Sequence, residues 1–281
     1  MMYISDETIE RFIKEDVPYI DLTTLVLGIG NENGQICFTA REDTVLSGVE
    51  EVIKIFNKLG IGKAGFLPSG TRVRSGETFI RGEGLCSNLH MAWKVSLNIL
   101  EYCCGIATRT RRLVDKAKSA NPDISIVSTR KSFPGTKELA IKSIIAGGAF
   151  PHRLGLSETI LIFKQHVNFL GGLEQLPQMI KQIKMNACEK KIIVEVENDT
   201  EAMMMAGLDI DGLQFDKVPA AQLKNMVKEI RSINPRITLI AAGGVNESNA
   251  DEYAITGVDA IATTSVYFGK PSDIKVIIEK C

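Results

Sequence analysis

From about residue 121 onward, short apolar segments alternate with segments of helical spacing such as "AAQLKNMVKEIRSI". Several apolar segments are continuous and rich in Ile and Val, as expected for parallel strands that are buried on both faces. Regular alternation of this kind predicts an α/β barrel. A doubly wound open sheet is the alternative, because periodicity alone does not distinguish a closed sheet from an open one. The predicted strands are "ISIVST", "TILIFK", "KIIVEVE", "GLQFD", "ITLIAAGG" and "DAIATTS".

The chain before about residue 108 has a different rhythm. Short strand-like runs are separated there by glycine-containing turns, and helical patterns occur at about 47–58 and 88–104. This arrangement predicts a small α+β domain ahead of the barrel.

Charge and composition exclude several classes of partner. A net charge of -1 over 281 residues gives no general attraction to nucleic acid or to an anionic membrane. The six cysteines show no CxxC spacing and are expected to be reduced. The chain begins with an acidic, amphipathic segment, so we expect neither a signal peptide nor a membrane span, and a cytoplasmic location follows.

Polar and small residues stand where the predicted strands end, which is where α/β barrels carry their active sites. The last two strands run into turns that are expected to open helices, and free amide groups at helix N-termini suit a phosphate group. The residues at the strand ends are Thr129, Arg130, Lys131, Lys164, Glu195, Glu197, Asp216, Gly243, Gly244, Thr264 and Ser265.

A candidate anion site lies near the first of these strands. Arg130 and Lys131 end that strand, and His152 and Arg153 follow one helix later. Two such pairs facing each other across a βα unit would make a receptor for a polyanion.

A candidate acidic site lies on two successive strands. Glu195 and Asp216 could converge at the barrel mouth and hold Mg²⁺ or a ribose diol, or they could pair with nearby lysines. Glu197 lies two residues beyond Glu195, on the same strand face, so either glutamate could fill this position.

Seven motifs in order along the chain carry a family resemblance: "DLTT" at Asp21, "AREDTVLSG" at Ala40, "GIAT" at Gly105, "STRKSFPG" at Ser128, "PHRLGL" at Pro151, "VEVEN" at Val194 and "AAGGVNESNADEYAITGVDAIA" at Ala241. Together they resemble the quinolinate phosphoribosyltransferase (nicotinate-nucleotide pyrophosphorylase) family of NAD biosynthesis. The resemblance is greatest to the ModD branch, whose members are associated with molybdenum-transport genes.

The resemblance implies a fold and an assembly. Residues 1–108 would form an N-terminal α/β sandwich domain completed by residues 271–281, and residues 109–270 an incomplete α/β barrel. A homodimer or higher homo-oligomer with shared active sites is expected. The implied reaction moves phosphoribose from phosphoribosyl pyrophosphate to the ring nitrogen of a carboxylated heteroaromatic such as quinolinate, with Mg²⁺ present and pyrophosphate leaving.

The resemblance also implies roles for twelve residues. Lys131, Glu195 and Asp216 would be catalytic, and the two carboxylates would also hold Mg²⁺. The 5′-phosphate would lie on Gly243, Gly244, Thr264 and Ser265, and the substrates would be bound by Lys94, Arg130, His152, Arg153 and Lys164.

Four departures from the family pattern concern the acceptor and phosphate sites. Lys94 replaces an arginine that, in the family, is contributed across the dimer. Phe163 replaces the lysine of "LIKDNH" while Lys164 takes the next position. Ile240 replaces an acid, and Thr264-Ser265 replaces a glycine-alanine loop. A changed acceptor is therefore expected. The alternatives are a non-catalytic or differently specific ModD-type protein that binds a phosphorylated ligand in molybdate handling, and a barrel aldolase or epimerase acting on a sugar phosphate.

Overall fold

The computed structural model describes residues 2–281, and these divide into two compact units. The sandwich unit consists of the chain up to Arg111, together with Phe133–Gly148 and Tyr267–Cys281. The barrel unit consists of Arg112–Ser132 and Ala149–Val266. The domain boundary predicted near residue 108 falls within one continuous helix, α4 (Cys86–Ala120). Helix α5 (Lys137–Ala146) belongs to the sandwich unit, although its sequence lies among the barrel strands.

The sandwich unit is built on a four-stranded antiparallel sheet in the order β13-β1-β5-β3. Its edge strand β13 lies last in the sequence and pairs antiparallel with β1. The register of this pair sets Ile274 opposite Ala40 and Lys280 opposite Gly34. The elements of this unit, besides α4 and α5, are α1 (Asp6–Asp16), α2 (Leu22–Leu27), β1 (Asn33–Ala40), β2 (Thr44–Val45), α3 (Val49–Lys58), β3 (Gly62–Phe66), β4 (Arg72–Val73), β5 (Thr78–Leu85) and β13 (Ile274–Lys280).

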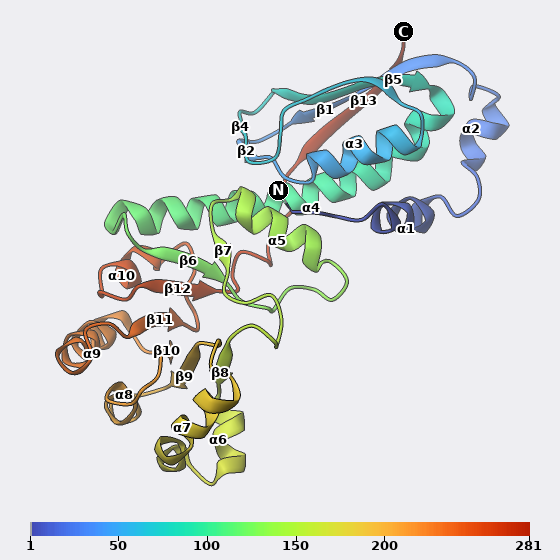
Figure 1. The fold of residues 1–281 in the computed structure, drawn as a ribbon. Helices are drawn as coiled ribbons and strands as arrows, with labels where there is room; N and C mark the ends of the chain where they lie inside the picture. Colours follow the sequence, from blue (N-terminus) through green and yellow to red (C-terminus); the bar gives the residue numbers. More distant parts are fainter. Residues whose placement is uncertain (1) are drawn as a thin grey trace. The chain divides into compact units, whose positions relative to one another are not determined.

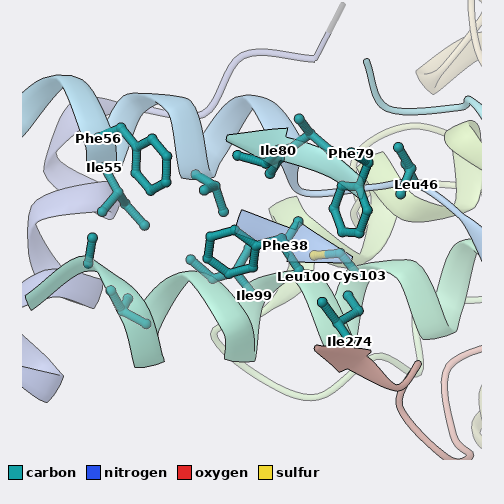
Figure 2. Packing of buried hydrophobic residues seen from close by; sticks show 14 of the residues in the cluster. Phe38, Leu46, Ile55, Phe56, Phe79, Ile80, Ile99, Leu100, Cys103 and Ile274 are labelled. Atoms are coloured by element: carbon teal, nitrogen blue, oxygen red, sulfur yellow. The ribbon is translucent and has the colours of Figure 1, made fainter. Parts of the chain in front are cut away.

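The core of the sandwich unit lies between the sheet and helices α3 and α4 (Figure 2). Phe38 from β1 and Phe56 from α3 are fully buried, with ring centroids 6.3 Å apart. Leu100 and Cys103 of α4 pack in the same cluster. Burial of these apolar side chains contributes about 25 cal/mol per Å² of apolar surface removed from water. This hydrophobic free energy is the main contribution to the stability of the unit.

The barrel unit contains seven parallel strands in the order β7-β6-β12-β11-β10-β9-β8. Strands β7 and β8 are the two ends of this order, and the described residues form no ladder between them, so the barrel is incomplete, as predicted. The strands are β6 (Ser125–Ser128), β7 (Phe150–Pro151), β8 (Ile160–Ile162), β9 (Ile192–Val196), β10 (Gly212–Asp216), β11 (Thr238–Ala242) and β12 (Ala260–Thr263).

Helices cover the outer side of this sheet; α8, α9 and α10 lie along one side of its strands in Figure 1. Helix α9 shows why: its buried residues Leu223, Met226, Val227 and Ile230 follow the spacing of one helical face. The helices of the unit are α6 (Lys164–Leu170), the short 3₁₀ helix Leu173–Gln175, α7 (Leu176–Asn186), α8 (Asp199–Ala206), α9 (Ala220–Ile233) and α10 (Ala250–Ala254).

Two local features differ from the predictions. The helix expected at about 88–104 is present but longer, and runs from Cys86 to Ala120. The turns after β11 and β12 do not open helices, because α10 begins only at Ala250 and no helix lies between Ser265 and β13 in the part of the chain that the structure describes. Separately, no helix within residues 2–281 combines the length and the apolar character needed to cross a membrane.

Candidate active site

A pocket of about 500 Å³ lies at the carboxyl ends of the barrel strands. It is lined entirely by residues of the barrel unit, and ten of the twelve residues predicted as site residues are among them. These ten are Arg130, Lys131, His152, Arg153, Glu195, Asp216, Gly243, Gly244, Thr264 and Ser265. The structure thus brings them together, and the role of each stays a prediction.

The other two predicted site residues lie elsewhere. Lys164 begins helix α6, and its Nζ is 2.6 Å from Oε2 of Glu197, so its charge is already paired outside the pocket lining. Lys94 belongs to α4 in the sandwich unit, where its Nζ lies 4.6 Å from the centre of the Trp93 ring.

The cationic side of the pocket is assembled by strand pairing. Strand β7 pairs in parallel with β6, which sets Pro151 beside Ser128 and brings the residues after both strands to one rim. Within residues 2–281, no ion pair joins Arg130, Lys131 or Arg153 to a carboxylate. These charges are therefore open to a ligand.

Burial changes the protonation of two groups on this side. The Arg153 residue is only 7% exposed, and burial, followed by repulsion from Arg130, lowers its pKa. Burial, followed by repulsion from Arg153, lowers the pKa of His152 below 6.5. At neutral pH, His152 is therefore a neutral hydrogen-bonding group rather than a cation.

The acidic side comes from β9 and β10. Glu195 lies opposite Gln214 in the strand register, and Nε2 of Gln214 donates a hydrogen bond of 2.7 Å to Oε2 of Glu195. Burial raises the pKa of Glu195 more than this hydrogen bond lowers it. Asp216 ends β10, with Nζ of Lys217 at 3.7 Å from its Oδ2. Strand β9 ends before Glu197, so Glu195 is the glutamate that lines the pocket.

The turn after β11 requires glycine for two different reasons. Gly243 and Gly244 have φ of 79° and 78°, in the left-handed region that favours glycine. A Cβ on Gly243 would also meet Oδ1 of Asp216 at 2.5 Å, whereas a Cβ on Gly244 would meet open space. Backbone amides in such turns form anion-binding concavities without a helix.

Hydroxyl groups connect the last turn to its neighbours. Oγ1 of Thr263 donates to the carbonyl oxygen of Val245 at 2.7 Å, and it also receives the backbone N–H of Ser265 at 3.1 Å. The hydroxyls of Thr129 and Thr264 lie 2.8 Å apart. The strand ends that would surround a phosphate are thereby held in one arrangement.

The carboxylates of the pocket fit a shared Mg²⁺ rather than a site that holds a metal unaided. The described residues form no group of three or more His, Cys, Asp or Glu side chains suited to a metal ion. Two carboxylates, Glu195 and Asp216, line the pocket. Proteins commonly bind Mg²⁺ through one or two carboxylates plus the phosphates of the substrate, so this pair suits a cation that arrives with a diphosphate.

Gln214 is a lining residue that sequence reasoning missed. It is 6% exposed and lies on the same strand face as Asp216, two residues away. The available signal was its position two residues before Asp216, on the same face of a strand whose other residues are apolar or glycine.

The two units of the chain correspond largely to two domains of one known enzyme family. The family model "Quinolinate phosphoribosyl transferase, N-terminal domain" matches residues 21–104, and the model of the C-terminal domain of the same family matches residues 106–276. The chain belongs to the quinolinate phosphoribosyltransferase family, which places it among the pentosyltransferase enzymes.

Relatives and solved structures agree with this assignment. The chain is 37% identical over 280 residues to "Putative pyrophosphorylase ModD" of Pasteurella multocida, covering 100% of this chain and 99% of that one. It is 27% identical over 258 residues to "Probable nicotinate-nucleotide pyrophosphorylase [carboxylating]" of Methanothermobacter thermautotrophicus, covering 91% and 92%. The crystal structure of nicotinate-nucleotide pyrophosphorylase from Ehrlichia chaffeensis has a TM-score of 0.90 at 27% identity, over 99% of this chain and 100% of that chain.

Proposed function

We propose that the protein transfers phosphoribose from phosphoribosyl pyrophosphate to the ring nitrogen of a carboxylated N-heteroaromatic acceptor, with release of pyrophosphate. The observation that carries this proposal is one pocket in which the unpaired cations Arg130 and Lys131 accompany the carboxylates Glu195 and Asp216. A volume of about 500 Å³ lies within the range of small-molecule sites.

In this reaction the lone pair of the ring nitrogen forms a bond to C1′ of the ribose while the bond from C1′ to the pyrophosphate oxygen breaks. The leaving group departs with that electron pair, and C1′ gains positive character as in other glycosyl transfers. Lys131 would offset the charge growing on pyrophosphate, and Glu195 and Asp216 would orient the ribose and favour positive charge at C1′. Bound Mg²⁺ would supply further neutralisation of the diphosphate.

The remaining lining residues would bind the two ends of the substrates. Arg130 and Arg153 carry guanidinium groups suited to a carboxylate, and neutral His152 adds a hydrogen-bonding group. The backbone amides at Gly243 and Gly244 and the hydroxyl groups at Thr264 and Ser265 would bind the 5′-phosphate.

The direct test measures pyrophosphate release with Mg²⁺ and the donor across a panel of pyridine, pyrimidine and purine carboxylates, with donor binding measured in parallel by calorimetry. Release that depends on one class of acceptor is expected. Donor binding without release for every acceptor would contradict the proposal and favour the non-catalytic ModD-type role in molybdate handling.

A pair of glycine variants tests the phosphate turn. Gly243→Ala places a methyl group 2.5 Å from Oδ1 of Asp216 and 2.7 Å from the backbone nitrogen of Lys217, so the turn must shift. This displacement should weaken donor binding about tenfold or more, beyond the strain of about 1–3 kcal/mol that a positive φ imposes on both glycine variants. Gly244→Ala is the matched control, because it has the same φ but open space around the added carbon. Equal effects of the two variants would show that the contact with Asp216 does not matter.

A homodimer with shared active sites is also part of the proposal. Apolar side chains of α2 are largely exposed, with Leu25 at 64%, Val26 at 74% and Leu27 at 64%, and an assembly that buried them would gain hydrophobic free energy. Sedimentation velocity of the wild type and of Val26→Asp tests this: a monomeric wild type would contradict it.

A further inference from the structure

The face of one of the pocket's cations is covered by an aromatic ring. The guanidinium carbon of Arg153 lies 5.5 Å from the ring centre of Phe163, close enough for a cation–π interaction. On the helix side, the imidazole of His166 stacks on the same ring with centroids 5.8 Å apart and an interplanar angle of 22°. Nδ1 of His166 also accepts the backbone N–H of Phe163 at 3.0 Å, so the ring is held from both directions.

Few positive charges of the barrel unit remain for an acceptor, since Nζ of the lining residue Lys217 lies 3.7 Å from Oδ2 of Asp216. Lys164 is paired with Glu197 away from the lining, and His152 is neutral at physiological pH. If Lys131 serves the leaving pyrophosphate, Arg130 and the edge of Arg153 are the cations left on this side, and they lie near enough for Arg130 to repel Arg153. They therefore form one cationic patch, which suits one carboxylate bound in bidentate fashion.

The floor of the pocket is apolar apart from one amide. Leu161, Ala242 and Ala262 line the pocket and belong to a buried cluster against which Phe163 packs. Gln214 interrupts this floor; its Nε2 bonds to Glu195, and its Oε1 has no hydrogen-bond partner within residues 2–281. A carboxylate pressed against Leu161 and Phe163 would lose its hydration without gaining a partner, which is costly.

We propose that the acceptor is a planar heteroaromatic ring with no more than one carboxylate, whose uncharged edge lies against Phe163. Phe163 is then the residue that excludes a second carboxylate, and this inference rests on the phosphoribosyl transfer proposed above. Gln214 lines the same pocket, and its amide oxygen, a hydrogen-bond acceptor, suits an N–H or amino group of the ring.

The experiment compares acceptors that differ by one carboxylate, such as pyridine-3-carboxylate and pyridine-2,3-dicarboxylate. Pyrophosphate release gives kcat/KM, and calorimetry in the presence of Mg²⁺ and pyrophosphate, the leaving group of the reaction, gives acceptor affinity. The wild type should prefer the monocarboxylate by about tenfold or more, because a buried unpaired charge is rejected strongly. Phe163→Lys should remove or reverse this preference, and Phe163→Leu should keep it.

Phe169→Lys is the matched control, since Phe169 lies on helix α6, whose N-cap is Phe163, is 94% exposed and does not line the pocket. It should leave the preference unchanged. Equal or better use of the dicarboxylate by the wild type, or an unchanged preference in Phe163→Lys, would overturn the inference while leaving phosphoribosyl transfer intact. Absence of both turnover and acceptor binding across all acceptors would instead overturn the proposed function, and the inference with it.

Discussion

In the sandwich unit, the buried ammonium of Lys142 lies 2.7 Å from Oε2 of Glu50 and 2.6 Å from Oε2 of Glu51. In the barrel pocket, the buried guanidinium of Arg153 has no carboxylate partner in the described chain, and Glu195 bonds only to a neutral amide. The first arrangement satisfies its charges within the protein, which suits a role in stability. The second leaves opposite charges on separate walls of a cavity, which suits a role in binding.

The pKa values reflect the same difference. Burial alone would raise the pKa of Glu50, but hydrogen bonds from Lys142 and Ser69 outweigh it and lower the pKa to about 2. For Glu195 burial prevails, and its pKa is raised. A buried carboxylate is thus stabilised as an anion in one unit and left poorly compensated in the other.

The largest effect is expected for Lys142→Met, because it leaves two glutamates buried without a counter-ion. The free energy of unfolding should fall by about 3–5 kcal/mol in urea titrations. Lys224→Met on the exposed face of α9 is the control. Adding Glu50→Gln and Glu51→Gln should recover most of the loss, and a loss below about 1 kcal/mol would contradict the structural role.

In contrast to Lys142→Met, Lys131→Ala should lower turnover and leave the stability of the fold almost unchanged. Removing a group that stabilises developing charge should lower kcat by about 10²–10³-fold. The free energy of unfolding should change by less than about 0.5 kcal/mol, since Lys131 forms no ion pair. Lys228→Ala is the control in both measurements, and an unchanged kcat would reject the proposed role.

The low pKa of Glu50 predicts an acid-labile sandwich unit. The folded-state pKa is about 2 and the ordinary value is 4.5, so the stability from this group is complete above pH 4.5 and is lost as the pH falls toward 2. After allowance for partial exposure, the loss should be on the order of 2 kcal/mol. Urea unfolding at pH 5 and pH 3 measures it. Glu50→Gln should flatten this dependence, and an equally steep profile in that variant would assign it to other groups.

The smallest effect is expected for Lys164→Ala. Its ion pair with Glu197 joins two partly exposed side chains, 60% and 42% exposed, and such pairs contribute about 0–1 kcal/mol. If this pair persists during turnover, kcat/KM should fall less than about threefold. A fall of tenfold or more would return Lys164 to the substrate site that its sequence position predicts.

Much of the barrel could be predicted, because its strands are continuously apolar and end in polar residues. Strand β10 coincides with the predicted "GLQFD", and α9 coincides with "AAQLKNMVKEIRSI". The ten predicted residues that line the pocket were expected to lie together, because the carboxyl ends of parallel barrel strands meet at one side of the barrel.

The remaining features depend on contacts that sequence spacing does not encode. Glu195 and Glu197 share a strand face by period, and only the end of β9 at Val196 separates them. The position of α5 depends on Lys142 meeting glutamates 91 and 92 residues away. The turn after β11 was expected to open a helix because Gly-Gly precedes a helical pattern, but α10 begins only at Ala250, after the N-cap Asn249.

The pairing of β13 with β1 has a consequence for biosynthesis. Strand β1 ends at Ala40, but its edge partner begins at Ile274, so the first sheet to be translated remains open on one side until the ribosome has passed residue 280. A separation this long between paired strands slows folding and leaves backbone donors of β1 available to other chains. Deleting residues 274–281 should therefore produce aggregation of the N-terminal part, and newly made chains should depend on chaperones until β13 has emerged.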